Sequence, residues 1–192
     1  MFDLIIKNGS IYDGKGSEPY QADIAISNEK IVEIGDIKGE AKKVIDAEGK
    51  IVTPGFVDIH THYDGQVTWD PYLRPSTYHG VTTVVMGNCG VGFSPCKPDQ
   101  RDWLIGLMEG VEDIPGTALH EGIDWEWESF PEYLDALEKK PLAIDVGTQI
   151  PHGAVRAYVM GERGINHEEA SQEEIDTMKE IVQEAIKAGA YG

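Results

Sequence analysis

Two histidines separated by a single residue are the strongest candidates for chemistry in this sequence. His60 and His62 close a short apolar segment, and residues two apart on a β-strand project to the same face. Both imidazoles could therefore bind one divalent metal ion, although such a pair also lines ordinary polar surfaces. Asp58 and Asp64 share the parity of the histidines, and Asp58 could orient an imidazole through a hydrogen bond outside the ligand sphere.

A cysteine is the next candidate. Cys89 lies just beyond a β-branched segment bounded by glycines, GVTTVVMGNCG, and a thiolate is a good zinc ligand. The alternative is a buried structural cysteine, which is the common fate of this residue. The chain holds two cysteines, too few for a disulfide framework, and their spacing suits neither CxxC redox chemistry nor a zinc finger. We interpret Cys96, the second of them, as structural.

Residues 1–54 predict a small β-rich domain of short strands and turns, either a β-sandwich or a partial barrel. The first β-rich stretch is expected to break at Asn8-Gly9, and the second to turn at Asn28-Glu29. A third pair of strands is expected to turn at Gly49. Strands this short and this closely spaced are not typical of a βαβ unit.

The pattern changes at Pro54-Gly55, and residues 55–192 predict an α/β domain. Buried strands are expected after Gly55, within 80–90 and within 142–153. Helices are expected between and after them, from their apolar spacing and from capping boxes: 102–109, 129–140 and 171–189. Alternating strands and helices favour a parallel sheet, and a closed β/α barrel of eight such units is one form of it. In such barrels, active sites lie at the carboxyl ends of the strands.

The motifs resemble those of a known family. The string IVTPGFVDIHTH is similar to the entry motif of the amidohydrolase superfamily, in which two histidines of the first barrel strand bind a catalytic metal. The string GVTTVVMGNCG is similar to the second-strand motif of the N-acyl-D-amino-acid deacylases, where the cysteine of NCG is a zinc ligand. The resemblance implies this role for Cys89, and it identifies the chain as an N-terminal portion of such an enzyme, with an incomplete metal-dependent hydrolase barrel of the TIM type.

A third stretch of the chain extends the resemblance. PHGAVRAYVMGERG is similar to a family segment that normally has glycine before its histidine, where this chain has Pro151. His152 is a candidate to line the site or to hold a loop. Arg156 is a candidate to bind a carboxylate in a bidentate manner, with a structural ion pair as the alternative. AGAYG at the end fits the family's entry to a fourth strand.

The implied activity is hydrolysis of the amide bond of an N-acyl-D-amino acid to a D-amino acid and a carboxylate, with one or two zinc ions. The remaining ligands and the catalytic base are expected beyond Gly192, so we expect residues 1–192 alone to be inactive and prone to self-association or to complementation by a C-terminal part. Two alternatives stay open. One is a cyclic-amide hydrolase related to dihydropyrimidinase or dihydroorotase; the other is a non-catalytic fragment that binds metal or a partner chain.

Charge and hydropathy exclude some classes of binding partner. The formal net charge of −18 argues against binding to nucleic acid or to an anionic membrane surface, because both would be repelled. No apolar stretch is long enough to cross a bilayer. The first residues lack the basic start and long apolar region of a signal peptide, so we expect a cytoplasmic protein that acts on a small molecule.

Overall fold

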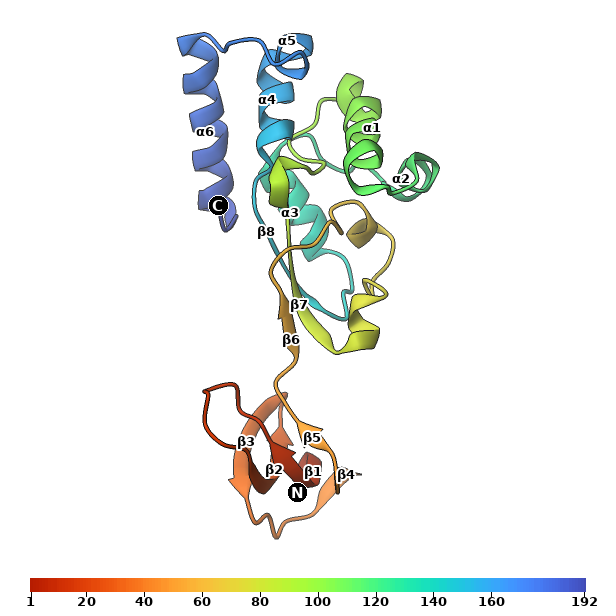
Figure 1. Cartoon of the computed structure of the whole chain (residues 1–192), viewed down its shortest axis with the longest axis vertical. Coiled ribbons are helices and arrows are strands. Elements are labelled where there is room, and N and C mark those ends of the chain that lie inside the picture. The colour runs from red at the N-terminus through yellow and green to blue at the C-terminus, as the bar shows by residue number, and fades with distance from the viewer. The chain divides into compact units, whose positions relative to one another are not determined.

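The computed structural model describes residues 1–192, which divide into two compact units, Met1–Gly55 and Phe56–Gly192. Each unit has its own sheet (Figure 1). Each also has its own cluster of buried apolar side chains. We describe them separately.

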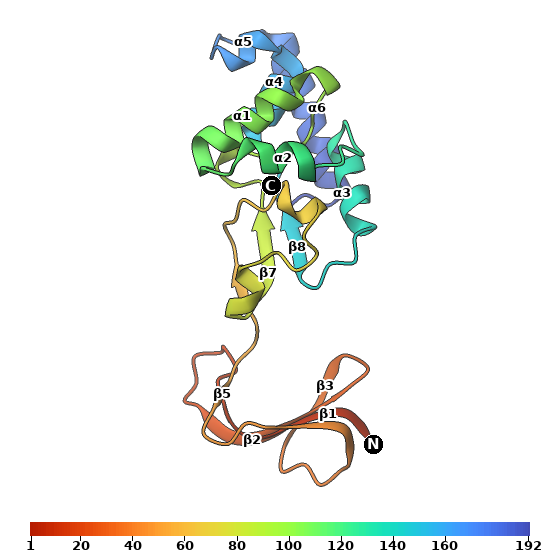
Figure 2. The ribbon, with the colours of Figure 1, turned by 90° about the vertical axis from the view of Figure 1, so that its right-hand side faces the viewer.

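The first unit is one mixed sheet of five strands (Figure 2). Its strands are β1 (Phe2–Ile11), β2 (Tyr20–Ser27), β3 (Lys30–Gly35), β4 (Ala41–Asp46) and β5 (Ile51–Val52). The order is β3-β2-β1-β4, with β5 also on β1. Ile5, Ala25 and Ile37 form a small buried cluster. The β-rich character is thus confirmed, whereas the second layer of a sandwich stays a prediction.

Two local predictions for this sheet are wrong. Asn8-Gly9 does not separate two strands, because β1 continues through it with an irregular register, and Asn8 adopts a left-handed φ of 61°. The turn at Gly49 is present, with a φ of 71° and a hydrogen bond from the Lys50 amide to the Ala47 carbonyl at 2.9 Å, but β4 and β5 do not pair across it. Both run parallel to β1 and follow one another along it. The turn at Asn28-Glu29 is confirmed, since both residues have the positive φ values of a tight hairpin turn between β2 and β3.

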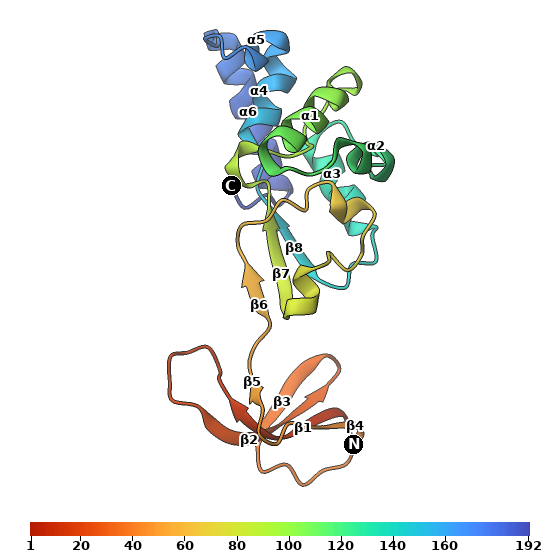
Figure 3. The ribbon, with the colours of Figure 1, turned by 45° about the vertical axis from the view of Figure 1, so that its right-hand side comes forward.

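The second unit contains a parallel sheet of three strands in the order β6-β7-β8 (Figure 3). These are β6 (Phe56–Asp58), β7 (Val81–Met86) and β8 (Asp145–Thr148). β7 is β-branched along most of its length, and Val84 and Met86 are fully buried in the main core. The predicted parallel sheet is therefore confirmed, and its closure into a barrel stays a prediction.

Helices connect and follow these strands. Between β7 and β8 lie α1 (Arg101–Glu112), α2 (Gly116–Gly122) and α3 (Phe130–Glu138); after β8 come α4 (His152–Met160), α5 (Glu162–Ile165) and α6 (Gln172–Ala188). Both predicted capping boxes are present, Ser129 with Glu132 and Ser171 with Glu174. The helix expected at 102–109 runs three residues further, to Glu112. None of these helices is both long and apolar enough to cross a membrane.

The region between Phe93 and Trp127, which has no clear sequence pattern, packs into the core through aromatic side chains. Trp127 donates its indole N–H to the Phe93 carbonyl at 2.8 Å, and its ring meets Tyr133 edge-on at 4.8 Å between centroids. Tyr133 in turn donates its hydroxyl to the Asp64 carbonyl at 2.9 Å. These contacts attach α3 to the loop that follows β6.

The last residues of the chain lie along β8. The Tyr191 amide donates to the Thr148 carbonyl, and the Ile150 amide donates to the Gly192 carbonyl, at 2.9 and 2.8 Å. These two bonds place the end of the chain beside β8 without assigning it to the sheet, so a strand entry at AGAYG stays a prediction.

Candidate metal centre

Three potential ligands meet beyond the carboxyl ends of β6 and β7. One ligand atom from each of His60, His62 and Cys89 lies within 4.8 Å of the other two. The closest pair is His60 Nε2 and Cys89 Sγ, which are 3.0 Å apart. Zinc binds nitrogen at about 2.0 Å and sulfur at about 2.3 Å, so two ligand atoms of one ion lie at most about 4.3 Å apart, and small side-chain shifts would bring all three atoms within that distance.

The histidines converge for a different reason than their strand parity. β6 ends at Asp58, so both rings belong to the loop that follows it. Thr61, between them, donates its amide and its hydroxyl to the Val85 carbonyl at 2.9 and 2.8 Å. This double hydrogen bond ties the loop to β7, and the two rings lie with centroids 5.3 Å apart. The convergence is found, but the predicted strand geometry is wrong.

A tight turn after β7 presents the cysteine. Gly87, Cys89 and Gly90 all have positive φ values, of 76°, 54° and 75°. A side chain at Gly87 would place its Cβ only 2.0 Å from the Gln149 carbonyl oxygen, so the turn requires glycine there. Asn88 supports the turn by donating its side-chain amide to the Val85 carbonyl at 3.0 Å. The NCG string therefore has a backbone role as well as a chemical one.

The donor set fits zinc. Imidazole nitrogen and thiolate sulfur are the ligands that zinc prefers, and a site of three protein ligands leaves a position for water or substrate. The Nδ1 atom of His62 is buried and has no hydrogen-bond partner within the protein. Buried polar atoms are normally satisfied, so an unpaired imidazole nitrogen in this cluster agrees with a metal ligand.

The two aspartates near the histidines both bind backbone amides. Asp58 accepts a hydrogen bond from the His60 backbone amide at 3.3 Å, which is a backbone contact, and its role as a partner of an imidazole stays a prediction. Asp64 is 2% exposed and accepts from the Gly87 amide at 2.8 Å, which joins the histidine loop to the cysteine turn. Burial raises the pKa of Asp64 to about 7, against the lowering effect of its backbone hydrogen bonds.

His152 and Arg156 lie on α4 and line a cavity together with Cys89. His152 begins the helix, and the cavity has a volume of about 660 Å³ and mainly apolar walls. Arg156 donates to the carbonyls of Gly164 and Glu168 and pairs with no carboxylate. It holds the segment around α5 in place. The alternative of a structural ion pair is therefore not met, whereas binding of a carboxylate by Arg156 stays a prediction.

The second cysteine is separate from this site. Cys96 is fully buried and donates its thiol to the Lys97 carbonyl at 3.3 Å. Burial raises the pKa of its thiol to about 12, so it remains protonated at neutral pH. This confirms the structural interpretation.

Sequence reasoning missed one residue of the site. Glu112, the last residue of α1, places Oε1 3.3 Å from His62 Nε2. The signal was available, because Glu112 follows the buried Met108 by four residues and so lies on the apolar face of the helix.

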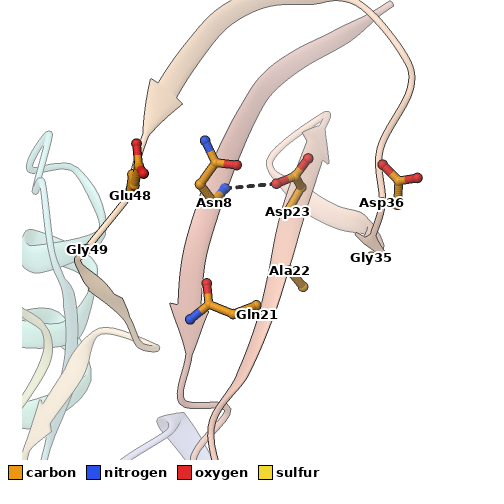
Figure 4. A pocket seen from close by; sticks show the side chains of 8 residues that line it. All are labelled: Asn8, Gln21, Ala22, Asp23, Gly35, Asp36, Glu48 and Gly49. Carbon is orange, nitrogen blue, oxygen red and sulfur yellow. Dashed lines mark hydrogen bonds between the residues drawn. The ribbon is translucent and has the colours of Figure 1, made fainter.

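A cavity of the first unit has a different character. It measures about 590 Å³ and is lined by polar and acidic groups of the small sheet, among them Asn8, Asp23, Asp36 and Glu48 (Figure 4). Asp23 already accepts from the Asn8 amide at 2.9 Å, and the lining contains neither histidine nor cysteine. Nothing in it matches the donor set around Cys89.

Comparison with known proteins places the chain in a family. The model of the amidohydrolase family matches residues 43–192, and the chain belongs to that family. It is 34% identical to D-aminoacylase of Alcaligenes xylosoxydans xylosoxydans over 192 residues, which are all of this chain and 37% of that enzyme. The predicted resemblance to the N-acyl-D-amino-acid deacylases is thereby confirmed, and the chain spans little more than a third of such a relative.

Solved structures agree. A crystal structure of D-aminoacylase matches the whole chain with a TM-score of 0.82 at 32% identity, over 38% of its own length. N-acyl-D-glutamate deacylase of Bordetella bronchiseptica, complexed with zinc and a phosphonate inhibitor, matches with a TM-score of 0.82 at 31% identity, over 37% of its length. An allantoinase of Salmonella is 45% identical, but over only 44% of this chain.

Proposed function

We propose that this chain provides the first ligands of a zinc-dependent deacylase that hydrolyses N-acyl-D-amino acids to a D-amino acid and a carboxylate. The observation that carries the proposal is the convergence of His60, His62 and Cys89 in a chain similar to D-aminoacylase over its whole length. One or two ions are compatible with this proposal. A bound zinc ion would supply Lewis-acid activation of the amide carbonyl and of water.

The residues of this chain prepare the site in three ways. His60, His62 and Cys89 would hold the ion, and metal binding would keep Cys89 deprotonated. Asp64 keeps the cysteine turn in register with the histidine loop through its hydrogen bond to Gly87. The apolar cavity beside Cys89 offers a water-poor surface to the substrate. The carboxylate that would return a proton to the leaving amine is proposed to belong to the part of the enzyme outside residues 1–192.

A cyclic-amide hydrolase is the second candidate, and the similarity to allantoinase favours it. That similarity covers less than half of the chain, whereas D-aminoacylase matches all of it, so the deacylase is preferred. Hydrolysis of allantoin or of a hydantoin, without hydrolysis of N-acyl-D-amino acids, would reverse this order. A non-catalytic fragment that binds metal is the third candidate.

The decisive experiment uses the full-length protein, loaded with zinc, on a panel of N-acetyl-D- and N-acetyl-L-amino acids. The proposal expects release of D-amino acids that stops when the metal is removed by a chelator and returns when zinc is added back. The chain of residues 1–192, assayed in parallel, is expected to bind zinc weakly and to release no amino acid. Hydrolysis by the full-length protein at an unchanged rate after metal removal would contradict the proposal.

The proposed setting is the cytoplasm, with a small-molecule substrate. The strong negative charge supports the absence of nucleic-acid binding. Association between copies, or with a separately expressed C-terminal part, remains a proposal that size-exclusion chromatography would test.

A further inference from the structure

Helix α1 carries two rows of apolar side chains. One row belongs to the main core, where Met108 is fully buried. The other row is formed by Trp103, Leu107 and Val111, because residues four apart lie next to one another along a helix. Trp103 and Leu107 are partly buried at the edge of the core, whereas Val111 is 53% exposed. Core packing therefore explains the first row and leaves the end of the second row open.

The second row of α1 lines the cavity of about 660 Å³ beside Cys89. The start of α4 and the segment around α5 also line it, and α1 and α4 both lie beyond the carboxyl end of β7 (Figure 2). A Cβ at Gly153 would lie only 2.7 Å from the Gly90 carbonyl oxygen, so α4 begins directly against the cysteine turn. A group held at the metal cluster can therefore extend into this cavity.

The lining of the cavity suits an uncharged apolar group. Its walls are mainly apolar, and its one lysine or arginine, Arg156, donates to the backbone carbonyls of Gly164 and Glu168. The acyl half of an N-acyl-D-amino acid carries no charge, whereas the amino-acid half carries a carboxylate next to its side chain. Placing that carboxylate among apolar side chains costs desolvation free energy, which the acyl half avoids.

We propose that this cavity receives the acyl chain of the substrate, and that Leu107 and Val111 determine how long a chain it accepts. The inference rests on the proposed function, because it places the amide that is cleaved at the metal cluster. The acyl chain is bonded to the amide carbonyl carbon itself, so a carbonyl held beside Cys89 lets the chain continue into the cavity that Cys89 lines. The volume of the cavity lies in the usual range of small-molecule sites.

The test compares N-acetyl-, N-butanoyl- and N-hexanoyl-D-alanine as substrates of the zinc-loaded full-length protein. Burial of one methylene group changes affinity roughly four-fold, so kcat/KM of the parent is expected to rise at least about 10-fold from acetyl to hexanoyl. Val111→Trp, which fills part of the cavity, is expected to abolish this rise. Asp102→Trp is the matched control, because it adds the same side chain nine residues away, on the opposite side of α1, and it should keep the rise.

A binding measurement separates the acyl cavity from a defect in catalysis. Metal-depleted full-length protein is titrated in a calorimeter with N-acetyl- and N-hexanoyl-D-alanine. The parent is expected to bind the hexanoyl compound at least about 10-fold more tightly than the acetyl compound, and Val111→Trp should lose this difference. A second series keeps the acetyl group and lengthens the amino-acid side chain from D-alanine to D-norleucine, and its trend should be the same in the parent and in Val111→Trp.

Equal responses to acyl length in the parent and in Val111→Trp would overturn the inference. An effect of Val111→Trp confined to the side-chain series would also overturn it, because the cavity would then hold the amino-acid half. Failure to hydrolyse any N-acyl-D-amino acid, with binding that still tightens with acyl length in the parent and not in Val111→Trp, would instead overturn the proposed function and support the role of the cavity.

Discussion

Two regions of the molecule gather polar side chains, and they differ in how those side chains are paired. In the small sheet, Asp23 and Asp46 both accept hydrogen bonds from Asn8, so the acidic groups there serve the backbone and its turns. Beyond the carboxyl ends of β6 and β7, imidazoles and a thiol approach one another, and His62 Nδ1 is left unpaired. Carboxylates that already accept hydrogen bonds are therefore weaker evidence for a metal site than a small group of imidazoles and a thiol in which one nitrogen is unpaired.

The largest effect on this difference between the two regions is expected when the thiol of Cys89 is removed. Cys89→Ser in the full-length protein is expected to lower zinc affinity and zinc-dependent hydrolysis at least 100-fold, because a hydroxyl is a much poorer zinc ligand than a thiolate. Cys96→Ala is the matched control, since Cys96 is buried away from the cluster. Cys96→Ala should bind zinc as the parent does and should lower only the free energy of unfolding. An equal loss of zinc in both variants would contradict the role of Cys89 as a ligand.

The next prediction concerns the turn that presents the thiol. Gly87→Ala is expected to lower the free energy of unfolding by about 1–3 kcal/mol or more, since it combines a left-handed φ with a contact of 2.0 Å to Gln149. Gly16→Ala, at a similar φ of 80° but with open space around it, should lose less and should bind zinc normally. Urea denaturation with and without zinc measures both effects.

A smaller effect is expected at the α5 segment. Arg156→Lys should lose the hydrogen bonds that tie α4 to the carbonyls of Gly164 and Glu168, at a cost of about 1 kcal/mol. Amide hydrogen exchange around 162–168 should become faster, while zinc affinity stays as in the parent. A large loss of zinc would show that Arg156 belongs to the metal centre after all.

The smallest effect belongs to the small sheet. The Asn8 side chain, and then the Glu48 amide, lower the pKa of Asp46 below its ordinary value. Because the folded pKa is depressed, the associated stability is present above the unfolded pKa, near 4, and is lost as the pH falls through the folded value. Asn8→Ala should raise the pKa of Asp46 in an NMR titration and leave zinc binding unchanged. An unshifted Asp46 would show that the hydrogen bond to Asn8 does not form in solution.

Much of the local structure could be predicted from short patterns. The capping boxes at Ser129 and Ser171 and the hairpin at Asn28-Glu29 depend on neighbouring residues, and all three are present. The pairing of β4 and β5 could not be predicted in this way. A turn at Gly49 is compatible with a hairpin and with two successive parallel strands, and only β1, distant in sequence, decides between them.

The candidate site shows the same division. Residue types and motifs were enough to select His60, His62 and Cys89, because the ligand chemistry belongs to the side chains themselves. Whether they meet was decided by long-range hydrogen bonds, from Thr61 to Val85 and from Gly87 to Asp64. The spacing to Met108 places Glu112 on the apolar face of α1, but its contact with His62 depends on how α1 packs on the core. The type of each residue determines which ligand atoms it offers. The distance between those atoms depends on how the strands pair and the helices pack, and only the tertiary structure decides that.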